Sequence, residues 1–119
     1  MYLRFKQKNK TILIMVSGEI DHHTSKELRR QTESAMSEMG GRNLVFDFTN
    51  VSFMDSSGIG MLIGRYKQLQ SMQGRIAIIC TEEKIVEIIR LSGLTKLFPV
   101  FDSLEDALSY AEGRERNAV

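Results

Sequence analysis

Apolar side chains near the start of the chain follow the two-residue period of β-strands. Residues 2–6 alternate polar and apolar, which indicates a strand with one face toward water. The run Ile12–Val16 is too short for a helix and rich in branched side chains, so it predicts a buried strand. Ser17 and Gly18 are expected to end that strand, and the two strands are expected to form an antiparallel hairpin.

The pattern then changes to the spacing of an amphipathic helix. Thr24 and Glu27 fit a capping box, in which a hydroxyl caps the helix and an acid three residues on reaches back. The residues that recur at helical spacing after it are Leu28, Thr32, Ala35, Met36 and Met39. Gly40 and Gly41 are expected to end this helix, because glycine accepts the left-handed conformation of a helix end.

Two further buried strands, Leu44–Phe48 and Arg75–Cys80, flank a second helical stripe that Gln73 and Gly74 end. The apolar face of this helix consists of Ile59, Leu62, Ile63, Tyr66, Leu69 and Met72. Because strand, helix and strand follow one another at these lengths, the two strands are expected to pair in parallel.

The last third of the chain predicts two more helices around a short strand. Thr81 caps a helix that carries Ile85, Ile88 and Ile89 and ends at Ser92-Gly93. Phe98–Phe101 is a short strand, and its proline favours the edge of a sheet. Ser103 caps the last helix, whose apolar positions are Leu104, Ala107, Leu108 and Ala111.

Alternation of strands and helices after an initial hairpin indicates an α/β fold. We expect a mixed four- or five-stranded sheet with about four helices packed on it. A length of 119 residues fits a single domain, 1–119, with its core at about 3–111 and a frayed tail at 113–119.

Composition removes several classes of function. A formal net charge of +1 gives no bulk electrostatic case for binding nucleic acid or an anionic membrane. The one cysteine, Cys80, follows an apolar run and is expected to be a core residue rather than a redox centre. No apolar stretch reaches the roughly 18 residues of a membrane span, and Met1–Lys10 lacks a signal-peptide core. We therefore expect a cytoplasmic protein.

The segment Met54–Gly60 carries the strongest candidate chemistry, because it lies between a strand and the start of a helix. Backbone N–H groups there lack partners within the helix, and the helix dipole favours a negative charge. A phosphate on Ser56 or Ser57 would be tolerated at this position. The alternative is that one of these serines only caps the helix, with Gly58 and Gly60 as turn residues.

Other chemistries have less support. The segment lacks the Gly-Lys-Ser/Thr of a P-loop, and no spacing supports a serine nucleophile activated by His22 or His23. The same two histidines lack a third metal ligand, so Asp21–Thr24 is interpreted as a polar turn before a helix. The scattered cations Arg65, Lys67 and Arg75 are expected on a solvated face. We expect no metal, no cofactor and no catalytic residue.

Four segments together resemble a known family. They are Gly18–Thr24, Val51–Gly60, Gly64–Lys67 and Leu91–Leu94. The resemblance is to the STAS domain of bacterial anti-sigma factor antagonists, and it extends from about Leu3 to Ala111. The Asp-His-His-Thr segment is most similar to the sporulation branch of the family, and the general-stress branch is also similar.

This resemblance implies a protein-binding switch and not an enzyme. The unphosphorylated form would bind an anti-sigma factor, itself a nucleotide-bound serine kinase, and release the sporulation sigma factor. The kinase would phosphorylate Ser56, and a serine phosphatase would reverse the step. The protein would act as a monomer, without nucleic acid or membrane. The implied partner-binding residues are Asp21, His22, Asp55, Ser56, Ser57, Gly58, Ile59 and Gly60.

Two alternatives remain at this point. One is a general-stress antagonist, or another STAS interaction module with a different partner. The other is a small enzyme or nucleotide-binding protein that uses the Ser-Gly segment, although no phosphate-binding lysine or acid–base pair supports it. The spacing of residues does not distinguish Ser56 from Ser57; only the resemblance selects Ser56.

Overall fold

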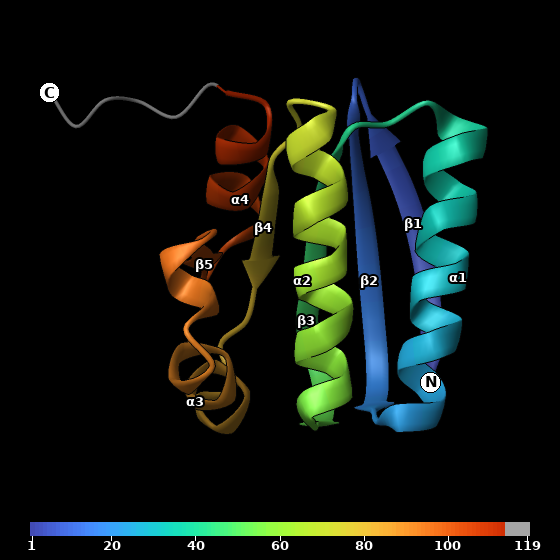
Figure 1. Cartoon of the computed structure of the whole chain (residues 1–119). Helices are drawn as coiled ribbons and strands as arrows, with labels where there is room; N and C mark the ends of the chain where they lie inside the picture. Colours follow the sequence, from blue (N-terminus) through green and yellow to red (C-terminus); the bar gives the residue numbers. More distant parts are fainter. Residues whose placement is uncertain (114–119) are drawn as a thin grey trace, which may run out of the picture.

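The computed structural model describes residues 1–113 and contains one five-stranded mixed sheet (Figure 1). Its strands, in spatial as well as chain order, are β1 (Tyr2–Lys8), β2 (Thr11–Ile20), β3 (Asn43–Met54), β4 (Ile76–Ile79) and β5 (Val100–Phe101). β1 is antiparallel to β2, and the other neighbours are parallel. The predicted mixed sheet, hairpin and edge position of the last strand are confirmed. Of the predicted frayed tail, residues 114–119 lie outside the described residues.

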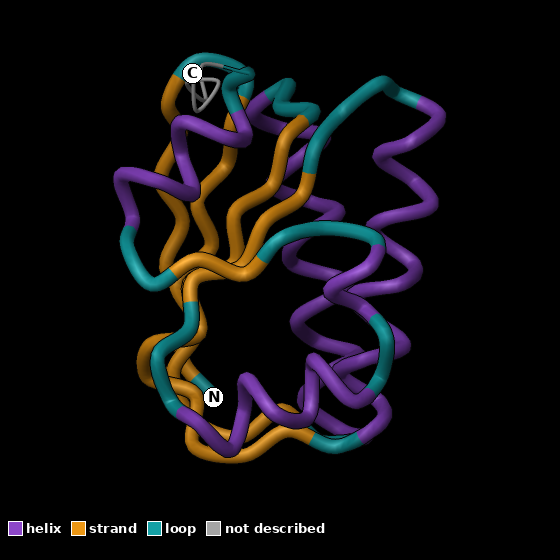
Figure 2. Tube along the Cα trace, turned by 90° about the vertical axis from the view of Figure 1, so that its left-hand side faces the viewer, coloured by secondary structure: helices purple, strands orange, loops and turns teal. Residues whose placement is uncertain are grey.

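Helices cover both faces of this sheet. They are α1 (His22–Met39), α2 (Ser56–Ser71), α3 (Glu83–Leu91) and α4 (Leu104–Ala111), with a short 3₁₀ turn at Leu94–Lys96. The first three share one core with the sheet, whereas α4 packs on the opposite face against β3 and β4. Figure 2, turned by 90°, shows helices on both sides of the strands.

The two cores follow from side-chain alternation along the strands. Ile12, Ile14 and Phe46 point to the face that carries α1, α2 and α3, and each is fully buried. Leu13, which lies between Ile12 and Ile14, and Val45, which directly precedes Phe46, point to the opposite face, which carries α4. Because both faces are covered there, the central segments Ile12–Val16, Leu44–Phe46 and Ile76–Ile79 contain only apolar residues.

The second strand does not end at Ser17-Gly18, contrary to the sequence prediction. β2 continues to Ile20, and its register with β3 shifts between Met15 and Ser17 and again between Gly18 and Glu19. Gly18 has a φ of 102°, which lets the strand bulge instead of ending. β3 likewise extends past Phe48 to Met54, because it pairs with this extension of β2. Both strands therefore end together.

The first helix begins earlier than predicted. Its N-cap is Asp21 and not Thr24: one carboxylate oxygen accepts the N–H groups of His23, at 2.9 Å, and Thr24, at 2.8 Å. The Thr24 hydroxyl in turn accepts the Asp21 N–H at 2.8 Å and closes a capping box. The expected polar turn at residues 21–24 is therefore the first turn of α1.

Other predicted helix ends have mixed outcomes. α3 is capped by Glu82, whose side chain accepts from the Lys84 N–H, and not by Thr81. α1 ends at Gly40 in the left-handed conformation, with a φ of 69°, and Ser103 caps α4; both were predicted correctly.

Candidate functional site

The starts of α1 and α2 lie side by side at one edge of the sheet, the lower edge in Figure 1. Ile20 and Met54, the last residues of β2 and β3, are register partners, and each is followed by an aspartate that caps the next helix. The Asp55 N–H donates to the Ile20 carbonyl oxygen at 3.1 Å, which ties the two segments together. The sheet thus places two helix N-termini, the positive ends of two helix dipoles, at one place, and the capping aspartates accept the N–H groups of His23, Thr24 and Ser57 there.

Asp21 remains ionised at this edge. The N–H of Thr24 is the main cause that holds the pKa of its carboxyl below the ordinary value, and the Thr24 hydroxyl and the His23 N–H add to it. Partial burial opposes this lowering without reversing it.

Neither serine of the candidate segment is the N-cap of α2. Asp55 occupies that position, and its carboxylate accepts the Ser57 N–H at 2.8 Å. Ser56 is the first residue of the helix and is exposed, while Ser57 is half-buried. The alternative in which a serine serves only as the cap is therefore wrong.

The two glycines of the segment differ in their surroundings. A β-carbon on Gly58 would lie 2.5 Å from Met54 Cγ and 2.7 Å from its Sδ, so α2 packs closely on the end of β3 there. A β-carbon on Gly60 would have no heavy atom within 4 Å, apart from the backbone of its own helix. Gly58 is thus explained by packing, whereas Gly60 leaves an open patch on the surface of α2.

The remaining residues of the predicted partner-binding surface occupy the same edge. Exposed members are His22, Ser56 and Gly60; half-buried members are Asp21, Asp55, Ser57 and Ile59. Ile59 packs partly against the main core, so it contributes to stability as well as to the surface.

A groove between α1 and α2, next to these residues, was not predicted. It has a volume of about 360 Å³, and its lining includes Lys26, Arg29, Ser57, Gly60, Gly64 and Arg65. Lys26 and Arg29 come from α1, one helical turn apart, and the other four come from α2. The groove therefore adds a cationic surface beside the two serines.

Arg65 corrects a sequence prediction, because it is buried and not part of a solvated face. It is only 7% exposed, and one terminal nitrogen lies 2.9 Å from a carboxylate oxygen of Glu33 on α1. Burial lowers the pKa of the Arg65 guanidinium, and the charge of Glu33 partly offsets that effect. Its position three residues after Leu62 and four before Leu69 places it in the apolar stripe, a signal that could have predicted its burial.

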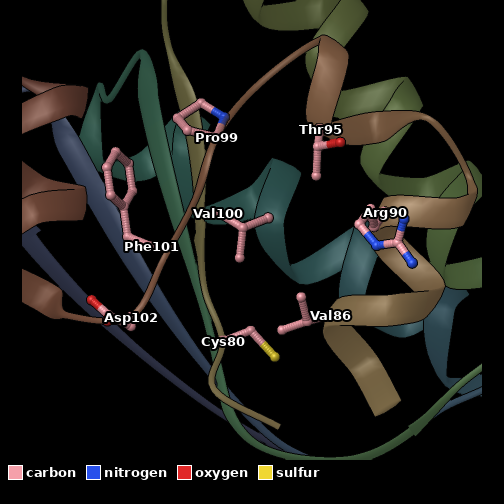
Figure 3. A pocket seen from close by; sticks show the side chains of 8 residues that line it. All are labelled: Cys80, Val86, Arg90, Thr95, Pro99, Val100, Phe101 and Asp102. Atoms are coloured by element: carbon pink, nitrogen blue, oxygen red, sulfur yellow. The ribbon is translucent and has the colours of Figure 1, made fainter. Parts of the chain in front are cut away.

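A second hollow, of about 630 Å³, lies between α3 and β5. Figure 3 shows Cys80, Val86 and Val100 among the side chains that line it. Cys80 is 4% exposed, which confirms its predicted core position. Burial raises the pKa of its thiol, so little reactive thiolate forms near neutral pH.

Among residues 1–113, no helix is both long enough and apolar enough to cross a membrane. Within the same residues, no three side chains of the types that bind metals gather into a candidate metal site. His22 and His23 lie exposed in the first turn of α1.

Comparison with known proteins decides the family. The model of the STAS domain matches residues 2–107. The chain belongs to the STAS domain family. This result confirms the resemblance described above and the predicted fold.

Named relatives of this STAS domain are antagonists of anti-sigma factors. The anti-sigma F factor antagonist of Paenibacillus polymyxa is 35% identical over 101 residues, which span 85% of this chain and 86% of the relative. The anti-sigma-B factor antagonist of Listeria monocytogenes is 29% identical over 87 residues, which span 73% and 75% of the two chains.

Two solved structures of the antagonist SpoIIAA share the architecture. The unphosphorylated form has a TM-score of 0.81 and 25% sequence identity. The match covers 97% of this chain and 100% of the SpoIIAA chain. The phosphorylated form, from Bacillus, has a TM-score of 0.72 and 25% sequence identity. The match covers 92% of this chain and 98% of the Bacillus chain.

Proposed function

We propose that this protein is an anti-sigma factor antagonist that phosphorylation of Ser56 switches off. In its unphosphorylated form it binds a nucleotide-bound anti-sigma factor, which is a serine kinase, and thereby releases a sporulation sigma factor. A serine phosphatase reverses the phosphorylation. The observation that carries this proposal is the exposed Ser56 at the first position of α2, beside the ionised Asp21. The names of the related antagonists, and the existence of SpoIIAA in two phosphorylation states, support it.

The surroundings of the two serines favour Ser56 as the phosphorylated residue. Ser56 is exposed, so a kinase can reach its hydroxyl, whereas Ser57 is half-buried and lines the groove with Lys26 and Arg29. A phosphate on Ser57 would be partly neutralised by these cations. A phosphate on the exposed Ser56 would instead add a charge of about −1.5 to −2 to the solvent-facing surface of the site.

The fold is expected to change little on phosphorylation. The N–H groups at the start of α2 and the helix dipole tolerate an added anion. Binding would fall because the phosphate occupies space at the contact surface and, together with Asp21 and Asp55, repels a kinase that holds an anionic nucleotide. A hundredfold weaker complex requires about 2.7 kcal/mol.

The partner-binding surface in this proposal consists of Asp21, His22, Asp55 and the segment Ser56–Gly60. Since Gly60 exposes its backbone, the active site of a kinase can approach the serines closely. The protein acts as a monomer in the cytoplasm, where the kinase and its nucleotide are present.

A second candidate is a general-stress antagonist with a different kinase partner. The similarity to an anti-sigma-B factor antagonist favours it, although the anti-sigma F relative is more similar in sequence and matches a longer segment. Binding of purified protein to the two classes of kinase from one host separates these candidates.

The phosphorylated residue is tested by mass spectrometry of the intact protein and its peptides after incubation with the host's anti-sigma kinase and ATP. Wild type and Ser57→Ala are expected to gain one phosphoryl group, and Ser56→Ala none. Transfer to Ser56→Ala would contradict the assignment, and no transfer by an active kinase would favour an interaction module without a switch.

A further inference from the structure

The groove between α1 and α2 carries more positive charge than its own side chains neutralise. Lys26, Arg29 and Arg65 line it. The one acid that pairs with any of them is Glu33, through its ion pair with Arg65. In the described part of the chain, neither Lys26 nor Arg29 forms an ion pair. The groove therefore has an excess of about two positive charges.

Arg65 gives this groove a second, independent feature. Its side chain is 8% exposed, and its Nε atom is buried without a hydrogen-bond partner. A buried guanidinium nitrogen without an acceptor costs free energy, so the positive charge at the base of the groove is not fully compensated within the protein. The positive charge of Arg29 also contributes to the lowered pKa of Arg65, which shows that the two cations lie close enough to repel each other.

The wall that α2 contributes is open at two glycines. Gly60 and Gly64 are one helical turn apart, and a β-carbon on either would meet no heavy atom within 4 Å, the backbone of their own helix aside. A side chain on another protein can thus reach the cations past this wall. The groove also contains Ser57, so it is continuous with the proposed partner-binding surface.

We propose that the groove between α1 and α2 is a docking site for a carboxylate side chain of the protein partner. The carboxylate enters past Gly60 and Gly64 and pairs with Lys26 and Arg29, while Arg65 forms the floor. Charge complementarity selects an acidic residue, and the continuity with Ser57 assigns it to the partner that contacts the serines. This inference rests on the proposed function, and it adds an anchoring contact next to the proposed partner-binding surface.

Two neighbouring arginines on α1 provide a matched test. Arg29 lines the groove, whereas Arg30 pairs with Glu27 and does not line it. The dissociation constant of the anti-sigma kinase complex is measured for wild type, Arg29→Glu and Arg30→Glu. Because Arg29→Glu sets a carboxylate against a carboxylate, it is expected to weaken binding by about tenfold or more, and Arg30→Glu by less than about threefold. Equal effects of the two variants, or no effect of Arg29→Glu, would overturn the proposal.

A second arm separates failure of the groove from failure of the proposed function. An oligoglutamate peptide is titrated into isotope-labelled full-length protein, and amide NMR shifts are followed. Shifts at Gly60 and Gly64 in wild type and Arg30→Glu, lost in Arg29→Glu, would support the groove even if wild type bound no anti-sigma kinase. Absence of these shifts in wild type would overturn the groove, whatever the kinase does.

Discussion

The backbone N–H of Asp55 donates a hydrogen bond of 3.1 Å to the carbonyl oxygen of Ile20, and this contact joins the two halves of the site. Ile20 ends β2 immediately before Asp21, the cap of α1, while Asp55 is itself the cap of α2. The caps are therefore positioned relative to each other by the backbone, and Ser56 follows directly. The site is thus built as a continuation of the sheet.

The close packing of Gly58 predicts different effects for two nearby glycines. Gly58→Ala would bring a β-carbon within 2.7 Å of the buried Met54 side chain, so we expect a loss of about 1–3 kcal/mol in the free energy of unfolding. Gly60→Ala is the control, since it meets nothing there and gains helix propensity worth up to about 1 kcal/mol. Urea denaturation of both variants tests this, and equal stabilities would contradict the packing.

Asp55 is expected to matter for stability as well as for binding. Asp55→Ala removes the acceptor for the Ser57 N–H and should cost about 1 kcal/mol of unfolding free energy. Asp55→Asn keeps an acceptor oxygen and should cost much less. Denaturant unfolding of the two variants distinguishes loss of the cap from loss of the charge; a larger loss for Asn than for Ala would contradict the capping role.

Asp21 predicts a pH dependence with a defined sign. The pKa of Asp21 is lower in the folded protein than its ordinary value of 3.8. The ionised carboxylate therefore stabilises the fold, and this contribution is fully present when the pH is above that ordinary pKa. The contribution is lost as the pH falls through the lowered folded pKa. Wild type should therefore exceed Asp21→Asn in stability at about pH 7, and the difference should shrink below about pH 4.

Unfolding of wild type and Asp21→Asn across this range measures the difference directly. Hydrogen bonds from Arg30 and Gln31 lower the pKa of Glu27 to about 2. Because Glu27 is present in both proteins, its contribution to the pH dependence cancels in the difference between them. A stability difference that grows toward acid would contradict the account of Asp21.

Arg65 is expected to be retained for binding and not for stability. Its guanidinium is buried with an unpaired Nε, and its partner Glu33 can return to water because that side chain is 43% exposed. Arg65→Met should leave the free energy of unfolding within about 1–2 kcal/mol of wild type, or raise it. Denaturation tests this, with Glu33→Gln as the control, and a much larger loss would make Arg65 a structural residue.

Periodicity in the sequence predicted the strands, the order of elements and the stripes on the helices, because burial enforces the two periods. The predicted end of β2 and the predicted start of α1 were wrong for a common reason. Gly18 was interpreted as a terminator, but its pairing with Val51 continues the strand, and Asp21 then competes successfully with Thr24 for the cap. Pairing across the sheet is not visible in local patterns.

The candidate site was only partly predictable. The segment Met54–Gly60 could be recognised because it lies at a strand-to-helix junction, and Asp21 was implied only by the family resemblance; the structure adds the backbone hydrogen bond that brings the two segments together. The groove was missed because its walls come from two helices, and the burial of Arg65 depends on how these helices pack.

The proposed switch is tested most directly by calorimetric binding of the anti-sigma kinase, with its nucleotide, to the unphosphorylated protein and to the same protein phosphorylated on Ser56. Our account predicts a tight complex for the first form and about a hundredfold or greater loss of affinity for the second, with little change in the fold. Equal affinity of the two forms, or no binding by the unphosphorylated form, would contradict it.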